Sequence, residues 1–357
     1  MRAKGTSVQC EEEEPATSSA RLPPMQHLLS QAKALGFNRQ YVQKCILPSW
    51  WDDEIATTPA GMAEAMALVA RHTGADFESL RAGNTPRFRS AQCLFKRAAG
   101  KSDSDLTLSK ALGVQLAGFA SLGVNTPVST LPTSGATVRD AIIGEGQPVT
   151  LKSLVDYCWR MGVIVLQFSS LPKGAKKMHA MATIANGRPA IVVSHKATDS
   201  HLLFDVAHEL GHLGLCHIRD GETLVDEKID EDPRDDEQEA AANTYALCVI
   251  TGGPARISLR EGHRFPNATQ LAQAAKEHGN TRNVDAGHIV LNYAHTMIRR
   301  GNGNSGAFWG TANAALKQLE VRTEGLLTIS EAANKNIQWD ALPEDAAEFT
   351  RRLVVMP

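Results

Sequence analysis

The feature that most constrains this chain is a pair of histidines inside an apolar helical run. The stretch FDVAHELGHLGLCH, residues 204–217, places His208 and His212 four residues apart, with Glu209 directly after the first. Residues four apart lie on one face of an α-helix, so the two imidazoles are expected to point the same way. The apolar residues around them fall largely on other faces and can enter a core. The pattern predicts a core helix that presents two histidines and a carboxylate.

This spacing is the HExxH arrangement, in which two imidazoles bind one metal ion and the glutamate serves as a general base. A bare HExxH also arises by chance on surface helices, so a third ligand is needed. Glu239 is preferred because it lies within a helical pattern in which Asn243 follows four residues later, on the same face. Glu239 can then bind the metal while Asn243 holds a histidine ring. The alternative is that Glu239 is a solvated charge at an acidic helix start. The neighbouring acidic candidates are Asp235, Asp236 and Glu237.

Length and composition describe an ordinary globular protein. The 357 residues are 43% hydrophobic and 21% charged, with a net charge of −2, so no global field recruits nucleic acid. Six cysteines are scattered without a CxxC pair, which favours a reducing compartment. The N-terminal residues lack the apolar segment of a signal peptide, and no apolar run approaches the roughly 20 residues that span a bilayer. We therefore expect a cytoplasmic protein without a membrane segment.

The chain divides into four predicted parts. Residues 1–24 are polar, acidic and rich in Pro and Ser, which predicts a disordered tail. Residues 25–145 form a helical N-terminal region, either helix-turn-helix-like or a plain docking domain. Residues 146–260 carry the histidine pair, and residues 261–357 are mostly helical. A Pro/Thr/Gly-rich linker is expected at 125–148.

The third part changes character along its length. A β-branched run at 163–171 predicts a strand, and two more strands are expected around Asn186-Gly187, a strong hairpin signal. A helix beginning near Asp199 carries the histidines. An acidic loop at 219–236 and a helix at 237–250 follow.

These residues resemble the ImmA/IrrE metallopeptidases. The shared pattern is a strand that ends in Ile-Val-Val, a helix with Phe-x-x-x-His-Glu-Leu-Gly-His, and a later helix with Glu-x-x-Ala-Asn-x-aromatic-Ala. Here these motifs are Ile191-Val192-Val193, Phe204 with 208–212, and Glu239 with Ala242, Asn243, Tyr245 and Ala246. The resemblance covers about 162–254. It departs at Ala241, where many relatives carry a second glutamate, and at 247–254.

The resemblance implies an α+β fold: a mostly helical chain with a gluzincin-like metallopeptidase core, made of a small antiparallel sheet and the HExxH helix. It implies an endopeptidase with Zn²⁺ bound by His208, His212 and Glu239; manganese is the alternative metal. Relatives cleave a helix-turn-helix repressor and so release stress, mobile-element or phage-defence genes. A narrower resemblance is to CapP-like regulators of anti-phage systems.

Two features of catalysis stay open at this stage. Strand 188–194 is a candidate to pair with an extended substrate by β-augmentation. An oxyanion-stabilising donor is not evident, and the candidates Tyr245, His217 and His263 are equally consistent with packing or surface roles.

A basic connector suggests a competing function. Arg87, Arg89, Lys96 and Arg97 alternate with Phe88 and Phe95, a composition suited to single-stranded nucleic acid and equally to a solvated linker. The competing hypothesis is a DNA-binding transcriptional regulator that uses the metallopeptidase core as a scaffold. The two hypotheses are compatible if single-stranded DNA activates the peptidase.

The same connector contains Cys93. Nearby arginines and lysines favour a thiolate, which is a better zinc ligand than water. Cys93 is therefore a candidate inhibitory zinc ligand, and an ordinary connector cysteine is the alternative.

Overall fold

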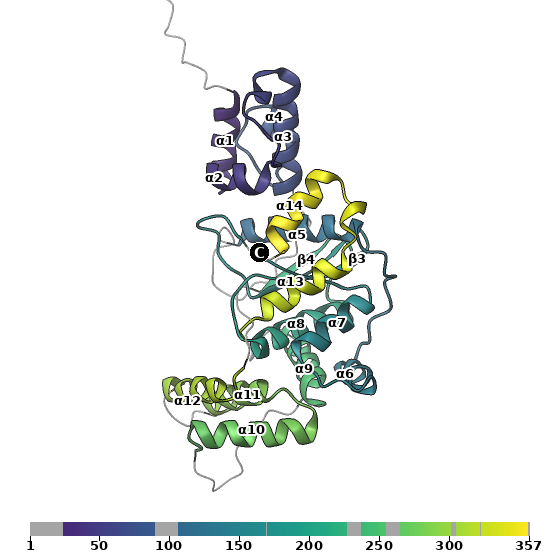
Figure 1. The fold of residues 1–357 in the computed structure, drawn as a ribbon, viewed down its shortest axis with the longest axis vertical. Helices are drawn as coiled ribbons and strands as arrows, with labels where there is room; N and C mark the ends of the chain where they lie inside the picture. The colour runs from purple at the N-terminus through teal and green to yellow at the C-terminus, as the bar shows by residue number, and fades with distance from the viewer. Residues whose placement is uncertain are drawn as a thin grey trace, which may run out of the picture.

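The structure is a computed structural model that describes residues 24–89, 106–168, 170–226, 237–254, 265–300, 305–321 and 323–355. Figure 1 shows a central body of helices around a sheet, with one helical bundle above it and another below. The expected α+β chain, mostly helical, is confirmed.

The upper bundle contains α1 (Pro24–Ala34), α2 (Arg39–Tyr41), η1 (Val42–Ile46), η2 (Ile55–Thr57), α3 (Pro59–Thr73) and α4 (Phe77–Arg81). The central body contains α5 (Thr107–Leu122), α6 (Gly135–Gly144), α7 (Leu151–Arg160), α8 (Asp199–Gly214), α9 (Glu237–Thr251), α13 (Gly325–Asn336), η4 (Trp339–Ala341) and α14 (Glu344–Val354).

Four strands among the described residues form one sheet in the order β1-β3-β2-β4. Their bounds are Ile164–Gln167, Ala180–Ala185, Arg188–Val193 and Thr223–Asp226, from β1 to β4. The predicted hairpin joins β2 and β3, and both turn residues have positive φ, 53° at Asn186 and 73° at Gly187. These angles fit the two-residue turn that suits the twist of paired strands.

The sheet is mixed rather than purely antiparallel, which corrects the expectation. β1 runs parallel to β3, whereas β2 is antiparallel to both β3 and β4. The physical reason is that β2 and β3 are joined by a tight turn and must be antiparallel. β1 enters the sheet on the far side of β3 through a longer connection, which leaves its direction unconstrained.

Helices cover both faces of this sheet. Figure 1 shows α5 and α14 above the strands and α8 below them. α5 contacts β1, β2 and β3, whereas α8 contacts β2 and β3. Buried apolar residues from the strands, such as Ile191 and Val192, fill the space between the layers. α8 is thus held between the sheet and the helices α7, α9 and α11.

Two elements lie where the sequence predicted only loops. α6 lies inside the predicted linker at 125–148, and it forms because Val138 and Ile142 are buried where α6 packs on α9. β4 lies inside the predicted acidic loop, where Thr223 and Leu224 are buried and the strand pairs with β2. In both cases a tertiary contact stabilises an element whose local pattern is weak.

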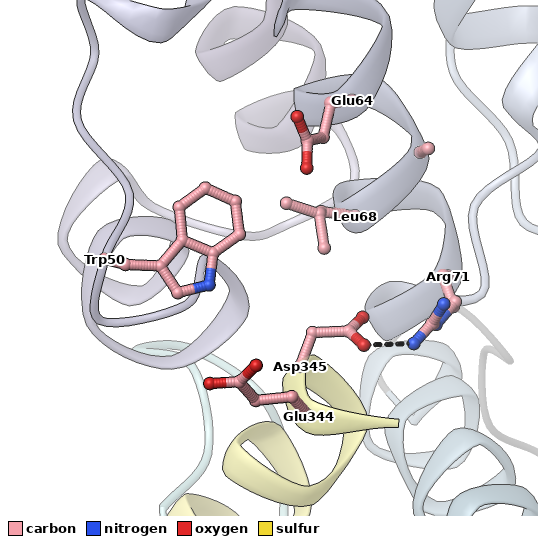
Figure 2. Close-up of a pocket in the computed structure, with 7 residues that line it drawn as sticks. Trp50, Glu64, Leu68, Arg71, Glu344 and Asp345 are labelled. Atoms are coloured by element: carbon pink, nitrogen blue, oxygen red, sulfur yellow. Dashed lines mark hydrogen bonds and ion pairs between the residues drawn. The ribbon is translucent and has the colours of Figure 1, made fainter. Parts of the chain in front are cut away.

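The upper bundle contacts the central body through α5 and α14. Asp345 accepts a hydrogen bond from Arg71 and approaches Nε2 of His72 at 3.1 Å. His72 is buried, donates from Nδ1 to the carbonyl of Ile46 at 2.6 Å and stacks on Phe349. Burial alone would raise the pKa of Asp345, but the hydrogen bond with His72 and the charge of Arg71 lower it below its ordinary value. Figure 2 shows Arg71 of α3 directed at Asp345 of α14.

The lower bundle consists of α10 (Ala268–Arg282), α11 (Ala286–Arg299) and α12 (Ser305–Gln318), which contact one another. α11 also contacts α8, so this bundle supports the helix that carries the histidines. Among the described residues, no helix combines the length and apolar character needed to cross a bilayer.

Candidate metal centre

The HExxH residues lie at the centre of α8, away from solvent. The helix begins at Asp199, as expected, and its residues from Leu202 to Gly214 are buried. His208, Glu209 and His212 are all fully buried. Polar side chains in such a place are costly unless they have polar or ionic partners. The chemistry of these side chains therefore depends on the polar and ionic groups that surround them.

Close packing of α9 on α8 brings a carboxylate to the histidines. A Cβ at Gly211 would lie 3.1 Å from Cβ of Tyr245 and 3.2 Å from Cα of Ala242, so only glycine fits without a shift. The small residues of α9 allow the same approach from the other side. Glu239, in the first turn of α9, thereby reaches the histidine pair.

Three donor atoms converge at this point. Nε2 of His208 lies 2.9 Å from Nε2 of His212. The two oxygens of Glu239 lie 3.3 Å from Nε2 of His208 and 3.4 Å from Nε2 of His212. The structure thus brings together the three residues predicted to be ligands, and their donor atoms all lie within 4.8 Å of one another.

Each histidine is oriented by a partner at its other nitrogen. Nδ1 of His208 lies 3.0 Å from Oδ1 of Asn243, as the spacing within α9 predicted. An amide oxygen only accepts, so Nδ1 of His208 carries the proton and Nε2 keeps its lone pair in the neutral ring. Nδ1 of His212 lies 2.9 Å from Nδ1 of His217. When His212 donates in this pair, its Nε2 also presents a lone pair.

The sequence did not predict this contact of His217. α8 ends with the amide of His217 bonded to the carbonyl of His212 at 2.9 Å, and with Cys216 in the left-handed region at φ 58°. This turn is the Schellman geometry, which folds the chain back over the last helical turn. A polar residue five positions after the motif is the only signal in the sequence, and the cap lacks its usual glycine.

The three groups require a cation between them. Two imidazole lone pairs and a carboxylate repel one another unless protons or a metal ion lie between them. Burial alone would raise the pKa of Glu239, but the hydrogen bonds and charges of the two histidines lower it below its ordinary value. Glu239 therefore remains a carboxylate. Two imidazoles and one carboxylate are a donor set that fits a catalytic zinc ion, with one position left for a reactant.

The other predicted site residues have different surroundings. Tyr245 is buried, and its hydroxyl donates to the carbonyl of Pro132 at 2.9 Å. The hydroxyl proton is therefore already used and is not offered to a substrate. Arg87 is 78% exposed and lies 3.5 Å from Asp76, and Arg89 approaches Gln115. Cys93, Lys96, Arg97 and His263 lie outside the described residues, as do residues 1–23 of the predicted tail, whereas Pro24 begins α1.

The aromatic residue between the two described arginines packs inward. The backbone of Phe88 bridges to Ala75, and its ring lies edge-on to Phe37 with centroids 6.4 Å apart. This half-buried ring is part of the core of the upper bundle, so it is not presented to stack on a base.

The strand expected to bind substrate is internal. β3 pairs with β1 on one side and with β2 on the other, so both of its hydrogen-bonding edges are occupied. The expectation of β-augmentation at residues 188–194 is wrong for this reason. β4 is the strand at the end of the sheet next to β2.

Comparison with known proteins identifies the central domain. Residues 160–286 match the family model of peptidase M78, described as the IrrE N-terminal-like domain. Comparisons with curated proteins and with solved structures gave no match. The matched segment begins before β1 and includes α8 and α9 with the three converging donor residues. A family of metallopeptidases implies a divalent metal ion. Residues 160–286 are thus an IrrE N-terminal-like domain of the metallopeptidase type.

Proposed function

We propose that this protein is a zinc-dependent endopeptidase that cleaves a helix-turn-helix transcriptional repressor and so switches on stress or phage-defence genes. The observation that carries the proposal is the convergence of His208, His212 and Glu239 around one point, with Glu209 on the same buried helix. The repressor substrate and the zinc ion rest on the resemblance to ImmA/IrrE peptidases.

Three residues bind the metal, one acts as the general base, and two orient the histidines. His208, His212 and Glu239 hold the zinc ion, which when bound polarises the scissile carbonyl and lowers the pKa of water. Glu209 accepts a proton from the attacking water and returns it to the leaving amine. Asn243 and His217 orient the two imidazoles through their Nδ1 atoms.

An extended substrate would pair with β4. β3 is closed on both sides, and β1 is covered by α13 and α14. β4 bonds to β2 along one edge, and β2 lies directly against α8. A peptide added to the outer edge of β4 would continue the sheet that packs on α8, the helix that carries the HExxH residues.

Glu209→Gln tests the mechanism. The amide cannot accept the proton from water, so cleavage of a purified repressor should stop while metal content and thermal unfolding stay near the parent values. Glu237→Gln is the matched control, since Glu237 is an exposed residue of the first turn of α9. Undiminished cleavage by Glu209→Gln would exclude this general base.

The competing function is a DNA-binding regulator with the metallopeptidase core as a scaffold. The exposed guanidinium groups of Arg87 and Arg89 favour it, although Phe88 packs inward. Proteolysis assays with and without single-stranded DNA separate the possibilities. Cleavage that requires DNA indicates a DNA-activated peptidase, whereas DNA binding without any cleavage supports the regulator.

A further inference from the structure

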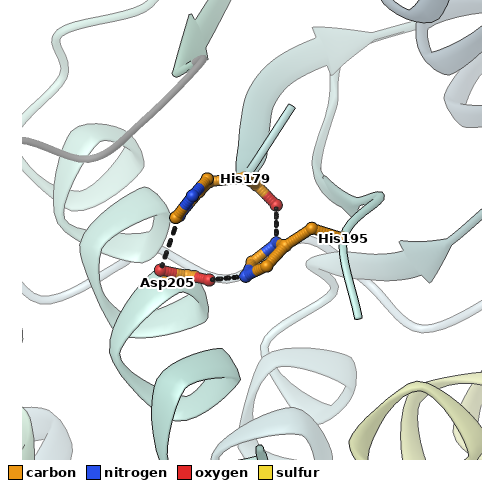
Figure 3. Close-up of side chains that lie close together, drawn as sticks. All are labelled: His179, His195 and Asp205. Atoms are coloured by element: carbon orange, nitrogen blue, oxygen red, sulfur yellow. Dashed lines mark hydrogen bonds and ion pairs between the residues drawn. The ribbon is translucent and has the colours of Figure 1, made fainter. Parts of the chain in front are cut away.

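A second cluster of metal-ligating side chains lies at one end of the β2–β3 hairpin (Figure 3). His179 directly precedes β2, and His195 follows β3 by two residues. Asp205 comes from α8, three residues before His208, so it lies about one helical turn away from the first centre. The donor atoms of the three residues all lie within 4.8 Å of one another.

The backbone holds these histidines in place. Oγ of Ser194 donates to the carbonyl of Met178 at 2.6 Å and accepts from the amide of Met178 at 2.9 Å. This pair locks the ends of β2 and β3 together beside the two histidines. Nδ1 of His195 then lies 3.0 Å from the carbonyl of His179, which fixes the orientation of the His195 ring.

The fixed ring directs a lone pair at a carboxylate. A carbonyl oxygen only accepts, so Nδ1 of His195 carries the proton and Nε2 of the neutral ring is an acceptor. That Nε2 lies 3.2 Å from Oδ2 of Asp205. The Asp205 side chain is only 6% exposed, and its Oδ2 has no hydrogen-bond partner among the residues that the structure describes. Two acceptors that face each other, one on the buried Asp205 and one on the partly buried His195, favour a cation between them.

Burial of His195 also favours its neutral ring, which is the form that binds metals. Burial lowers the pKa of His195 below its ordinary value, and the charges of His179 and Lys177 add to this effect, although the charge of Asp205 opposes it.

We propose that His179, His195 and Asp205 bind a second divalent transition-metal ion, separate from the HExxH centre. Two imidazoles and one carboxylate suit ions such as Zn²⁺, Mn²⁺ or Fe²⁺, with water in the remaining positions. The ring of His179 stacks on that of His195 with centroids 4.2 Å apart, so it has to turn to face the ion. It is the most exposed of the three side chains, at 35%, and it has room to do so.

This ion would tie the end of the β2–β3 hairpin to α8. Since one of the three ligands has to turn, we expect weaker binding than at the HExxH centre. The proposal does not depend on peptidase activity, because it concerns residues that the proposed mechanism does not use.

Zinc titration of the metal-free full-length chain, in competition with a chromophoric chelator, tests the proposal. The parent should bind two equivalents of Zn²⁺, and the Asp205→Asn and His195→Ala variants should bind one each. A double variant His208→Ala/His212→Ala should retain one equivalent, and addition of Asp205→Asn should remove it. His278→Ala, at an exposed position of α10, is the control and should bind two.

Thermal unfolding of each metal-free variant shows whether it is folded. If His195→Ala unfolds, the near-isosteric Asp205→Asn still decides. Two equivalents that survive both Asp205→Asn and His195→Ala would overturn the proposal, as would a parent that binds one equivalent and loses it in the His208→Ala/His212→Ala variant. If the HExxH centre itself bound no zinc, the His208→Ala/His212→Ala variant would bind as many equivalents as the parent. This result is distinct from the loss of the second site.

Discussion

Replacement of Asn243 tests whether the metal centre is organised by its outer hydrogen bonds. Asn243 is 4% exposed, and its Oδ1 lies 3.0 Å from Nδ1 of His208. Leucine has nearly the same volume but no acceptor, so Asn243→Leu leaves the buried Nδ1–H without this partner. Such a loss costs about 1–3 kcal/mol. Removal of an outer-shell partner lowers metal affinity by roughly 10- to 100-fold, which is about 1.4–2.8 kcal/mol. The two estimates agree.

Zinc affinity, measured by competition with a chelator, provides the assay. Asn243→Leu should raise the dissociation constant by about 10- to 100-fold, whereas Asn243→Asp retains an acceptor and should stay closer to the parent. Thr244→Ala is the matched control, because Thr244 is an exposed neighbour on α9. A folded Asn243→Leu variant with an affinity within about twofold of the parent would refute the reasoning.

The remaining predictions concern the third ligand, the helix packing and the α14 junction. Elemental analysis should show that Glu239→Ala loses the bound metal and Glu237→Ala keeps it; the reverse would overturn the choice of ligand. Gly211→Leu should lower stability by about 1–3 kcal/mol and weaken metal binding, since it forces α9 away from α8; Gly118→Leu is the control, where a Cβ meets nothing within 4 Å. Asp345→Asn should lower the free energy of unfolding by about 1.5–3 kcal/mol at neutral pH. Because the folded pKa of Asp345 lies below its ordinary value, the parent's advantage is present above about pH 4 and shrinks as the pH falls through the folded pKa; an advantage that persisted unchanged in acid would contradict this.

Local patterns predicted the parts of the site that lie on single elements. His208, Glu209 and His212 follow from the helical period, and the contact of Asn243 with His208 follows from the same period on α9. The Asn186-Gly187 turn was also visible, because positive φ at two successive residues requires such side chains. Each of these predictions used a spacing of at most five residues, although the contact of Asn243 with His208 itself joins two helices.

Features that depend on distant contacts were not predictable in the same way. The parallel pairing of β1 with β3 depends on how residues 168–179 cross the end of the sheet, which no periodicity encodes. β4 is short and forms by pairing with β2, so its own sequence gives little signal. The cluster of His179, His195 and Asp205 comes from three separate elements, and no spacing in the sequence relates them.

Polar residues buried within α8 explain both the success and the failure of sequence reasoning. Asp205, His208, Glu209 and His212 lie within a helix that the surrounding elements exclude from solvent. Apolar residues at these positions would avoid the desolvation cost of burying four ionisable side chains. Polar residues at these positions depart from the apolar pattern of a buried helix. Such departures are expected at functional sites. The periodicity of one helix reveals which residues depart from the pattern. It does not reveal their partners, since Glu239, His217 and the histidines of the hairpin reach α8 only after the chain has folded.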